Sequence, residues 1–326
     1  MTEAFTKLVD LAVDRNGGVV EAASDEFFAP KERLNLAEDP ITRPGIYTEN
    51  GKWMDGWESR RKRTPGNDWC IVRLGLPGRI LGADIDTTHF VGNHPPEASI
   101  DAADESREGR DPENWTPLLH RVPLKPNEHN YYEVADVGRV THVRLNIYPD
   151  GGVARLRVFG EVMPDWSAVG PGDVVELSSL SYGGVPIACN DEHFGRMMNL
   201  LQVDPPSSMG DGWETRRRRS PGYDWVVIRL GAPGTLERLE VDTTHFKGNH
   251  PDRCSVDACR LPDGSTDLIE ERYVRILDET KLDPNALHMF INLVKTGPFS
   301  HLRLNIYPDG GIARFRAFGR VASKDR

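Results

Sequence analysis

The chain has 326 residues, enough for one large domain or two of ordinary size. Charged residues make up 28% and hydrophobic residues 38%, with 31 glycines and 24 prolines, which is typical of a globular protein rich in turns. The net charge of −10 argues against nucleic acid as the main partner, because a phosphate-binding surface is usually basic.

The start of the chain has no basic region followed by an apolar one, so we expect no signal peptide. No apolar run is long enough to predict a membrane span. The four cysteines show no repeated disulfide framework, which favours free thiols in the cytoplasm. Cys254 and Cys259 alone supply too few ligands for a zinc site.

Long blocks of sequence occur twice, in the same order. The matching pairs are residues 55–69 and 211–225, 86–96 and 242–252, 142–152 and 301–311, and 153–160 and 312–319, with a weaker pair at 23–29 and 189–195. Because the spacing is long, each copy is expected to be a whole domain and not a solenoid repeat. A stretch rich in Pro and Gly at 163–173 predicts the boundary between two similar domains, 1–165 and 170–326.

The two copies differ in their loops. Residues 30–54 of the first copy, which include DPITRPGIYTEN, correspond to the shorter segment 196–210 of the second. Val91 in the first copy corresponds to Lys247 in the second. Three arrangements stay open: both copies are active, one has become a scaffold, or a site forms where copies or subunits meet.

The pattern along each copy predicts short β-strands. Residues 68–75 (DWCIVRLG) are rich in β-branched residues and precede a Gly-rich turn, and residues 81–90 and 98–102 continue in the same style. Trp69 and its counterpart Trp225 are expected in the core. Helical periodicity is convincing only in patches such as 191–201.

Residues 142–148 (HVRLNIY) alternate without a fault. Val143, Leu145 and Ile147 share one face, which we expect in the core, and polar residues occupy the other. PDGG then predicts a tight turn into 153–160, which alternates again. Many short strands bounded by turns predict a mostly β protein with one jelly-roll β-sandwich per copy.

Three paired blocks, DGWExRRxR–PG–DW, DTTHFxGNHP and RLNIYPDGG, resemble the allantoicase family, also called allantoate amidinohydrolases. The resemblance covers both copies, and so nearly the whole chain. It implies hydrolysis of allantoate to ureidoglycolate and urea in purine breakdown, two jelly-roll lobes, and a homo-oligomer such as a trimer or hexamer. Each domain is also similar to the discoidin or galactose-binding β-sandwich, through its Trp-led strand ending in Leu-Gly.

This reaction sets chemical requirements. Allantoate has one carbon that bears a carboxylate and two ureido groups. The departing nitrogen is a poor leaving group until it is protonated, so a general acid is required, and a general base must activate the water that adds. Arginine holds a carboxylate best, through a bidentate fork, while Asp, Asn and His suit the ureido groups.

Glu58 and its counterpart Glu214 each follow a tryptophan. A carboxylate beside an indole can have its pKa raised by loss of water, which suits a general acid, but it could equally pair with the arginines that follow. Those arginines are Arg60, Arg61 and Arg63 in the first copy and Arg216, Arg217 and Arg219 in the second. Such a run is typical of a solvated face or a ladder of ion pairs, although one arginine could bind substrate.

The polar face of 142–148 is the second candidate. Its predicted substrate-binding residues are Arg144, Asn146 and Tyr148 and their counterparts Arg303, Asn305 and Tyr307. Such a face is either open to solvent or part of a ligand surface, and the arginines suit a carboxylate or a ureido carbonyl. His142 and His301 share the face but could merely cap a loop.

The third candidate is the block DTTHFxGNHP. Its polar residues are Asp86, His89 and His94 and their counterparts Asp242, His245 and His250. The strand should end near His89, and strict alternation would place His89 inside and Asp86 outside, although a bulge could turn either.

Three interpretations of this block compete. The residue types suit a metal, but their spacing on a strand and turn is weak support for one. His89 or His94 could instead act as an acid or base near neutral pH, with Asp86 binding substrate. Alternatively the block is structural, with Thr87 and Asn93 capping the turn.

Two other functions compete with hydrolysis of allantoate. A tandem carbohydrate- or ligand-binding module is one, because this fold often only binds. A metal-dependent hydrolase of a related ureido acid, using an ion such as Mn²⁺, is the other. The well-matched polar loops favour a shared and chemically demanding site. No cofactor is firmly implied, and we expect a small-molecule substrate, no nucleic acid, no membrane and a cytoplasmic location.

Overall fold

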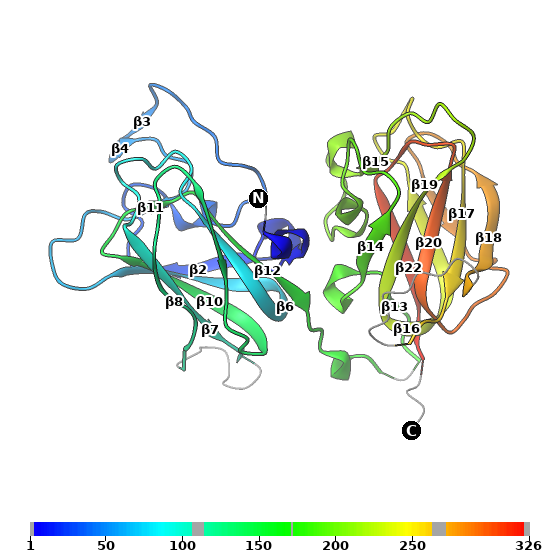
Figure 1. Cartoon of the computed structure of the whole chain (residues 1–326), viewed down its shortest axis with the longest axis horizontal. Helices are drawn as coiled ribbons and strands as arrows, with labels where there is room; N and C mark the ends of the chain where they lie inside the picture. Colours follow the sequence, from blue (N-terminus) through cyan, green and yellow to red (C-terminus); the bar gives the residue numbers. More distant parts are fainter. Residues whose placement is uncertain (1–2, 106–113, 171, 263–271, 323–326) are drawn as a thin grey trace. The chain divides into compact units, whose positions relative to one another are not determined.

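The computed structural model describes residues 3–105, 114–170, 172–262 and 272–322. The chain divides into two compact units, Met1–Pro164 and Asp165–Arg326. β-Strands dominate both units (Figure 1), which confirms the predicted mostly β fold. Among the described residues, no helix is long and apolar enough to cross a membrane.

The first unit contains short 3₁₀ helices and strands of very different lengths. The helices are η1 (Ala4–Lys7), η2 (Asp14–Asn16) and η3 (Lys31–Arg33). The strands are β1 (Val9–Asp10), β2 (Val19–Ala23), β3 (Tyr47–Thr48), β4 (Gly51–Lys52), β5 (Trp57–Glu58), β6 (Asp68–Asp86), β7 (Glu97–Ala103), β8 (Thr116–Pro123), β9 (His129–Glu133), β10 (Arg139–Tyr148), β11 (Gly152–Val153) and β12 (Arg155–Val162).

The second unit repeats this order without a counterpart of β3 and β4. Its 3₁₀ helices are η4 (Trp166–Ala168), η5 (Leu180–Tyr182), η6 (Met197–Leu201) and η7 (Met209–Asp211). Its strands are β13 (Val175–Glu176), β14 (Val185–Cys189), β15 (Trp213–Glu214), β16 (Asp224–Asp242), β17 (Arg253–Cys259), β18 (Val274–Lys281), β19 (Leu287–Phe290), β20 (Phe299–Tyr307), β21 (Gly311–Ile312) and β22 (Arg314–Val321).

One long strand joins the two layers of each sandwich. The first part of β6 pairs with β2 and β10, and its last part pairs with β9 and β12. In the second unit β16 likewise changes partners from β14 and β20 to β19 and β22. The Gly-rich turn predicted after residue 75 is therefore wrong, because the chain stays extended through 75–80 while it passes from one layer to the other.

The core follows the alternation along the strands. Val143, Leu145 and Ile147 of β10 are fully buried, as predicted. Trp69, however, is only half-buried, which corrects its predicted place in the core. Its neighbour Cys70 points into the core, so Trp69 lies on the opposite face of β6, and the same is true of Trp225 on β16. The helical periodicity at 191–201 yields only the single short helix η6.

Candidate active-site pocket

Glu58 sits on a narrow ribbon of strand in the first unit. It pairs with Gly152 of β11 on one side and forms a bridge with Ala29 on the other. Its side chain is 8% exposed, and Nδ2 of Asn93 donates a hydrogen bond of 2.8 Å to its Oε1. Burial raises the pKa of the Glu58 carboxyl above its usual value, although the bond from Asn93 acts in the opposite direction.

The turn after β6 carries Asn93, the donor to this carboxylate. The strand ends at Asp86, three residues earlier than predicted, and Phe90 is buried against Met54 and Ala154. This apolar anchor holds the tight turn in which the N–H of Phe90 donates to the carbonyl of Thr87 at 2.8 Å. His89 and Val91, on either side of Phe90, consequently lie at the surface of the unit, beside Glu58.

His89 occupies this turn in an unusual backbone conformation, with φ at 72°. Its N–H donates to Oδ1 of Asn127 at 2.8 Å, and its Nε2 contacts the carbonyl of Pro40 at 3.1 Å. A carbonyl only accepts, so Nε2 carries the hydrogen and Nδ1 keeps a lone pair when the ring is neutral. The backbone strain and the fixed tautomer together give this histidine a defined orientation.

A pocket of about 430 Å³ lies between these groups. Its lining residues are Phe28, Lys52, Met54, Glu58, His89, Val91, Gly92 and Asn93. Of the predicted residues of this unit, Glu58 and His89 therefore come together. His94 does not line the pocket, and its Nδ1 donates to the carbonyl of Val91 at 3.0 Å.

The turn PDGG, residues 149–152, packs against the loop that carries Asn93. A Cβ atom on Gly151 would lie 2.8 Å from the carbonyl oxygen of Asn93, and Gly151 has a positive φ of 141°. Both the space and the backbone conformation therefore require glycine here. The neighbouring Gly152 donates its N–H to the same carbonyl at 2.8 Å, so the third repeated block supports the turn that carries Asn93.

Asp86 does not face the outside of the sandwich, as strict alternation predicted. It is 1% exposed, and its Oδ1 accepts a bond of 2.8 Å from the N–H of Thr88. Asp86, His89 and His94 are directed to different partners because the strand has already ended. Within the described part of the chain, no three His, Cys, Asp or Glu side chains are grouped so as to hold a metal ion.

The polar face of β10 forms a separate network. Arg144 pairs with Asp101 at 2.8 Å, and Asn146 donates to the same carboxylate at 2.9 Å. The hydroxyl groups of Tyr148 and Ser99 are 3.0 Å apart. None of these residues lines the Glu58 pocket. The face is thus partly exposed and held in its own network, and it is not part of that pocket.

The second unit repeats this network closely. Arg303 pairs with Asp257 at 3.1 Å, and Asn305 donates to the same carboxylate at 2.8 Å. The hydroxyl of Tyr307 lies 2.9 Å from that of Ser255. Burial opposes the ionisation of Asp257, but hydrogen bonds from Arg275, Asn305 and Arg303 lower its pKa below the usual value.

The Glu58 arrangement also recurs in the second unit. Asn249 donates to Oε1 of Glu214 at 2.5 Å, and Nε2 of His245 donates to the carbonyl of Pro206 at 2.9 Å. His245 has the same φ of 72°. Glu214, however, is only partly buried, whereas Glu58 is buried. His250 has a buried Nδ1 with no hydrogen-bond partner among the described residues.

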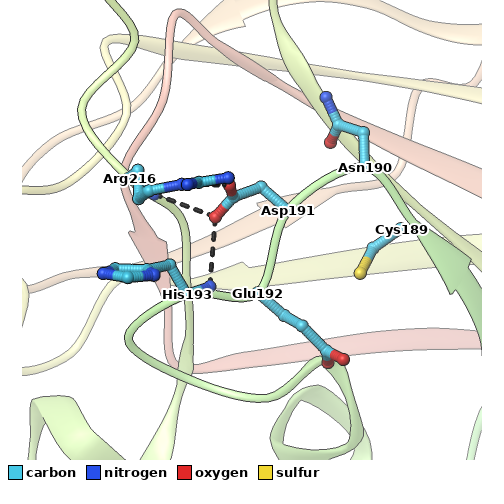
Figure 2. Close-up of a pocket in the computed structure, with 6 residues that line it drawn as sticks. All are labelled: Cys189, Asn190, Asp191, Glu192, His193 and Arg216. Carbon is cyan, nitrogen blue, oxygen red and sulfur yellow. Dashed lines mark hydrogen bonds and ion pairs between the residues drawn. The ribbon is translucent and has the colours of Figure 1, made fainter.

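The first arginine of each run pairs with an aspartate and not with Glu58 or Glu214. In a second pocket, of about 360 Å³, Arg216 pairs with Asp191 at 2.8 Å, and Asp191 also accepts a bond from the N–H of His193 (Figure 2). Arg60 makes the same pair with Asp25 in the first unit. These pairs join two loops at the surface.

Two features of the first unit carried no clear signal in the sequence. Lys52 reaches the pocket from a strand that the second unit lacks. His129 lies 2.7 Å from the buried carboxylate of Asp84, whose pKa burial raises to about 6. In β16 and β19, the matching register positions are occupied by Glu240 and Leu287. Only the difference between the copies could have pointed to either feature.

Two β-sandwich units, each with the same Glu–Asn hydrogen bond and a histidine at the same positive φ, define a duplicated β-sandwich protein. The family model described as the allantoicase repeat matches residues 9–163 and 175–322. The chain therefore belongs to the allantoicase family.

Relatives of known name agree with this assignment. The chain is 49% identical to a probable allantoicase of Stutzerimonas stutzeri over 322 residues, which are 97% of each chain. It is 47% identical to a probable allantoicase of Pseudomonas fluorescens over 323 residues, or 98% of each chain. The crystal structure of allantoicase from Saccharomyces cerevisiae is similar with a TM-score of 0.79 at 36% identity, covering 96% of this chain and 93% of that one.

Proposed function

We propose that this protein hydrolyses allantoate to ureidoglycolate and urea in purine catabolism. Membership of the allantoicase family and the names of its relatives support the reaction. The location of the active site is supported by the pocket of the first unit, which the buried Glu58 and the oriented His89 both line. A carbohydrate-binding module or a metal-dependent hydrolase of another ureido acid is not favoured.

Glu58 acts as the general acid. Its environment favours the protonated carboxyl, which can give its proton to the nitrogen of the departing ureido group. The C–N bond breaks with its electron pair on that nitrogen, so urea leaves. The lone pair of the remaining ureido nitrogen stabilises the positive charge that develops on the central carbon.

His89 acts as the general base. Its Nε2 is engaged with the carbonyl of Pro40, so Nδ1 accepts a proton from the attacking water. The hydroxide adds to the central carbon and completes ureidoglycolate. Exchange with solvent then returns the proton from His89 to Glu58, which restores both groups.

Each unit corresponds to one repeat of the family, with the predicted domains 1–165 and 170–326 as proposed boundaries. We assign the main catalytic role to the first unit because Glu58 is the better buried of the two carboxylates. Glu214 and His245 form a weaker second site. The catalytic roles of His94 and His250 stay predictions.

The substrate-binding roles of Asp86, Arg144, Asn146 and Tyr148, and of their counterparts in the second unit, stay predictions. Arg144 already has a carboxylate partner, which favours a role in holding the sheet face together. Substrate binding by this arginine would require it to leave Asp101.

We also propose a homo-oligomer in the cytoplasm. Leu287, Met289 and Ile291 are 54%, 59% and 69% exposed on and just after β19, an apolar stripe that fits contact with a second copy. The four cysteines are free, which suits a reducing compartment. Light scattering of the purified protein would test the assembly, and a monomer at micromolar concentration would contradict it.

The reaction is tested with purified protein and allantoate, by following urea and ureidoglycolate together. We expect the two products in equal amounts. The absence of urea release, both with and without added manganese, would contradict the proposed function.

A further inference from the structure

Lys52 lies on an element that only the first unit has. Strands β3 and β4 form a hairpin, with Tyr47 opposite Lys52 and Thr48 opposite Gly51. The hairpin belongs to the segment 30–54, and the shorter segment 196–210 of the second unit forms η6 and η7 instead. The extra residues of the first copy therefore build a defined structure beside the pocket.

Several contacts hold this hairpin in place. Nδ2 of Asn50 donates to the carbonyl of Phe27 at 2.8 Å. This bond joins the tip of the hairpin to the loop that follows β2. Two guanidinium groups lie over the Trp53 ring, with Cζ of Arg33 at 4.9 Å and Cζ of Arg43 at 4.7 Å from the ring centroid. Such contacts stabilise a surface element that has little core of its own.

The ammonium group of Lys52 is available for a ligand. The residue is exposed, lines the pocket that Glu58 and His89 share, and is the only lysine or arginine among the described lining residues. No carboxylate in the described part of the chain pairs with it. Arg144, the residue predicted to bind a carboxylate, is outside this pocket and pairs with Asp101.

We infer that Lys52 binds the carboxylate of the substrate in the pocket of the first unit, an inference that rests on the proposed function. The substrate carries one anionic group close to the carbon that reacts. Lys52 supplies one mobile positive charge to the pocket. Glu58 protonates the ureido nitrogen, and His89 accepts a proton from the water. The ligand class is therefore a small ureido acid with a free carboxylate.

The second unit offers a matched comparison. Its segment 196–210 contains no lysine, but Lys247 stands where the first unit has Val91, a pocket-lining residue. Lys247 is exposed and comes from a different loop. Lys52 is thus a specificity residue of one unit, and the substitution of Lys247 controls for the loss of a surface charge.

The test compares wild-type protein with the variants Lys52→Met, Lys52→Arg and Lys247→Met. Steady-state urea release is measured with allantoate and with its primary carboxamide, which has the same ureido groups and no charge. For Lys52→Met we expect KM for allantoate to rise roughly tenfold, the loss of one charge-assisted contact, with kcat little changed. Lys52→Arg should restore most of the affinity, and Lys247→Met should match wild type.

The carboxamide separates binding of the carboxylate from any effect on the hairpin. Wild-type protein should prefer allantoate to the carboxamide, and Lys52→Met should lose most of that preference. An unchanged KM in Lys52→Met, an unchanged preference, or an equal rise of KM in Lys247→Met would overturn the inference. The absence of urea release by wild-type protein would contradict the proposed function instead. Thermal unfolding confirms that each variant is folded.

Discussion

Asn93 donates a hydrogen bond from Nδ2 to Oε1 of Glu58 across 2.8 Å, and Asn249 does the same to Glu214 across 2.5 Å. In both units the partners are 35 residues apart in the chain. The bond therefore joins two of the repeated blocks, DGWE and GNHP, into one site. It also limits the effect of burial, because a donor to a carboxylate favours the ionised form.

Asn93→Ala removes this donor from a buried carboxylate. We expect the pKa of Glu58 to rise further, so that the decline of kcat/KM at high pH moves to a higher pH. The lost orientation should lower kcat/KM by about tenfold at neutral pH, equivalent to the net value of one hydrogen bond to a charged group. The measurement is a pH profile of urea release.

Asn249→Ala is the control for that variant, because Glu214 is less buried than Glu58. Its effect on the profile should be smaller. A profile for Asn93→Ala that declines at the wild-type pH would show that Glu58 is not the group whose protonation limits the rate.

Glu58→Gln should change how stability depends on pH. Burial raises the pKa of Glu58 in the folded state above the model value of 4.5, so the folded protein binds this proton more tightly than the unfolded chain. The resulting stabilisation is complete below pH 4.5 and is lost as the pH rises through the folded pKa. Relative to wild type, the glutamine variant should therefore become more stable over that range.

Chemical denaturation at several pH values measures this difference in the free energy of unfolding. Gln keeps an oxygen that can accept the bond from Asn93, so the comparison isolates the charge. A difference that stays constant with pH, or that changes in the opposite direction, would contradict the raised pKa.

His89→Asn separates the backbone from the chemistry of the imidazole. Asparagine tolerates the left-handed conformation at φ 72°, so the turn should keep its shape and the melting temperature should change little. Loss of the base should lower kcat/KM by roughly 10²-fold or more. His245→Asn, at the same φ in the second unit, should retain most of the activity.

Activity measurements with matched melting curves test this assignment. Equal losses in the two histidine variants would mean that both units contribute. Wild-type activity in His89→Asn would exclude this histidine as the base.

Arg144→Ala should affect stability more than substrate binding. The guanidinium pairs with Asp101 at 2.8 Å and lies 4.7 Å from the centroid of the Trp115 ring. Because the side chain is 30% exposed, we expect a loss of about 1 kcal/mol of unfolding free energy, with KM nearly unchanged. A tenfold rise in KM at wild-type stability would instead support the predicted role in substrate binding.

Much of the fold could be predicted because burial follows local patterns. The alternation of Val143, Leu145 and Ile147 and the duplication itself are properties of short stretches, and both the mostly β class and the sandwich follow from them. The crossing of β6 from one layer to the other could not be predicted, since the turn residues at 75–78 are also compatible with a strand that changes partners.

The site was predictable in part. Glu58 and His89 could be proposed from the sequence because their types suit the chemistry and recur, and both line one pocket. Their catalytic roles stay predictions. Lys52 could not be predicted from the sequence, because it lines the pocket with Glu58 only once the hairpin has folded. The exposure of Trp69 could not be predicted, because a large aromatic residue next to a buried strand position gives no local sign of which face it takes.

The central claim is that Glu58 is the general acid and that the main active site is the pocket of the first unit. It is tested most directly by measuring urea release from allantoate in the variants Glu58→Gln and Glu214→Gln. We expect Glu58→Gln to lose roughly 10²- to 10⁴-fold in kcat/KM, the usual contribution of a general acid, while remaining folded. Glu214→Gln should keep most of the wild-type rate. Full activity in Glu58→Gln, or a larger loss in Glu214→Gln than in Glu58→Gln, would contradict the account.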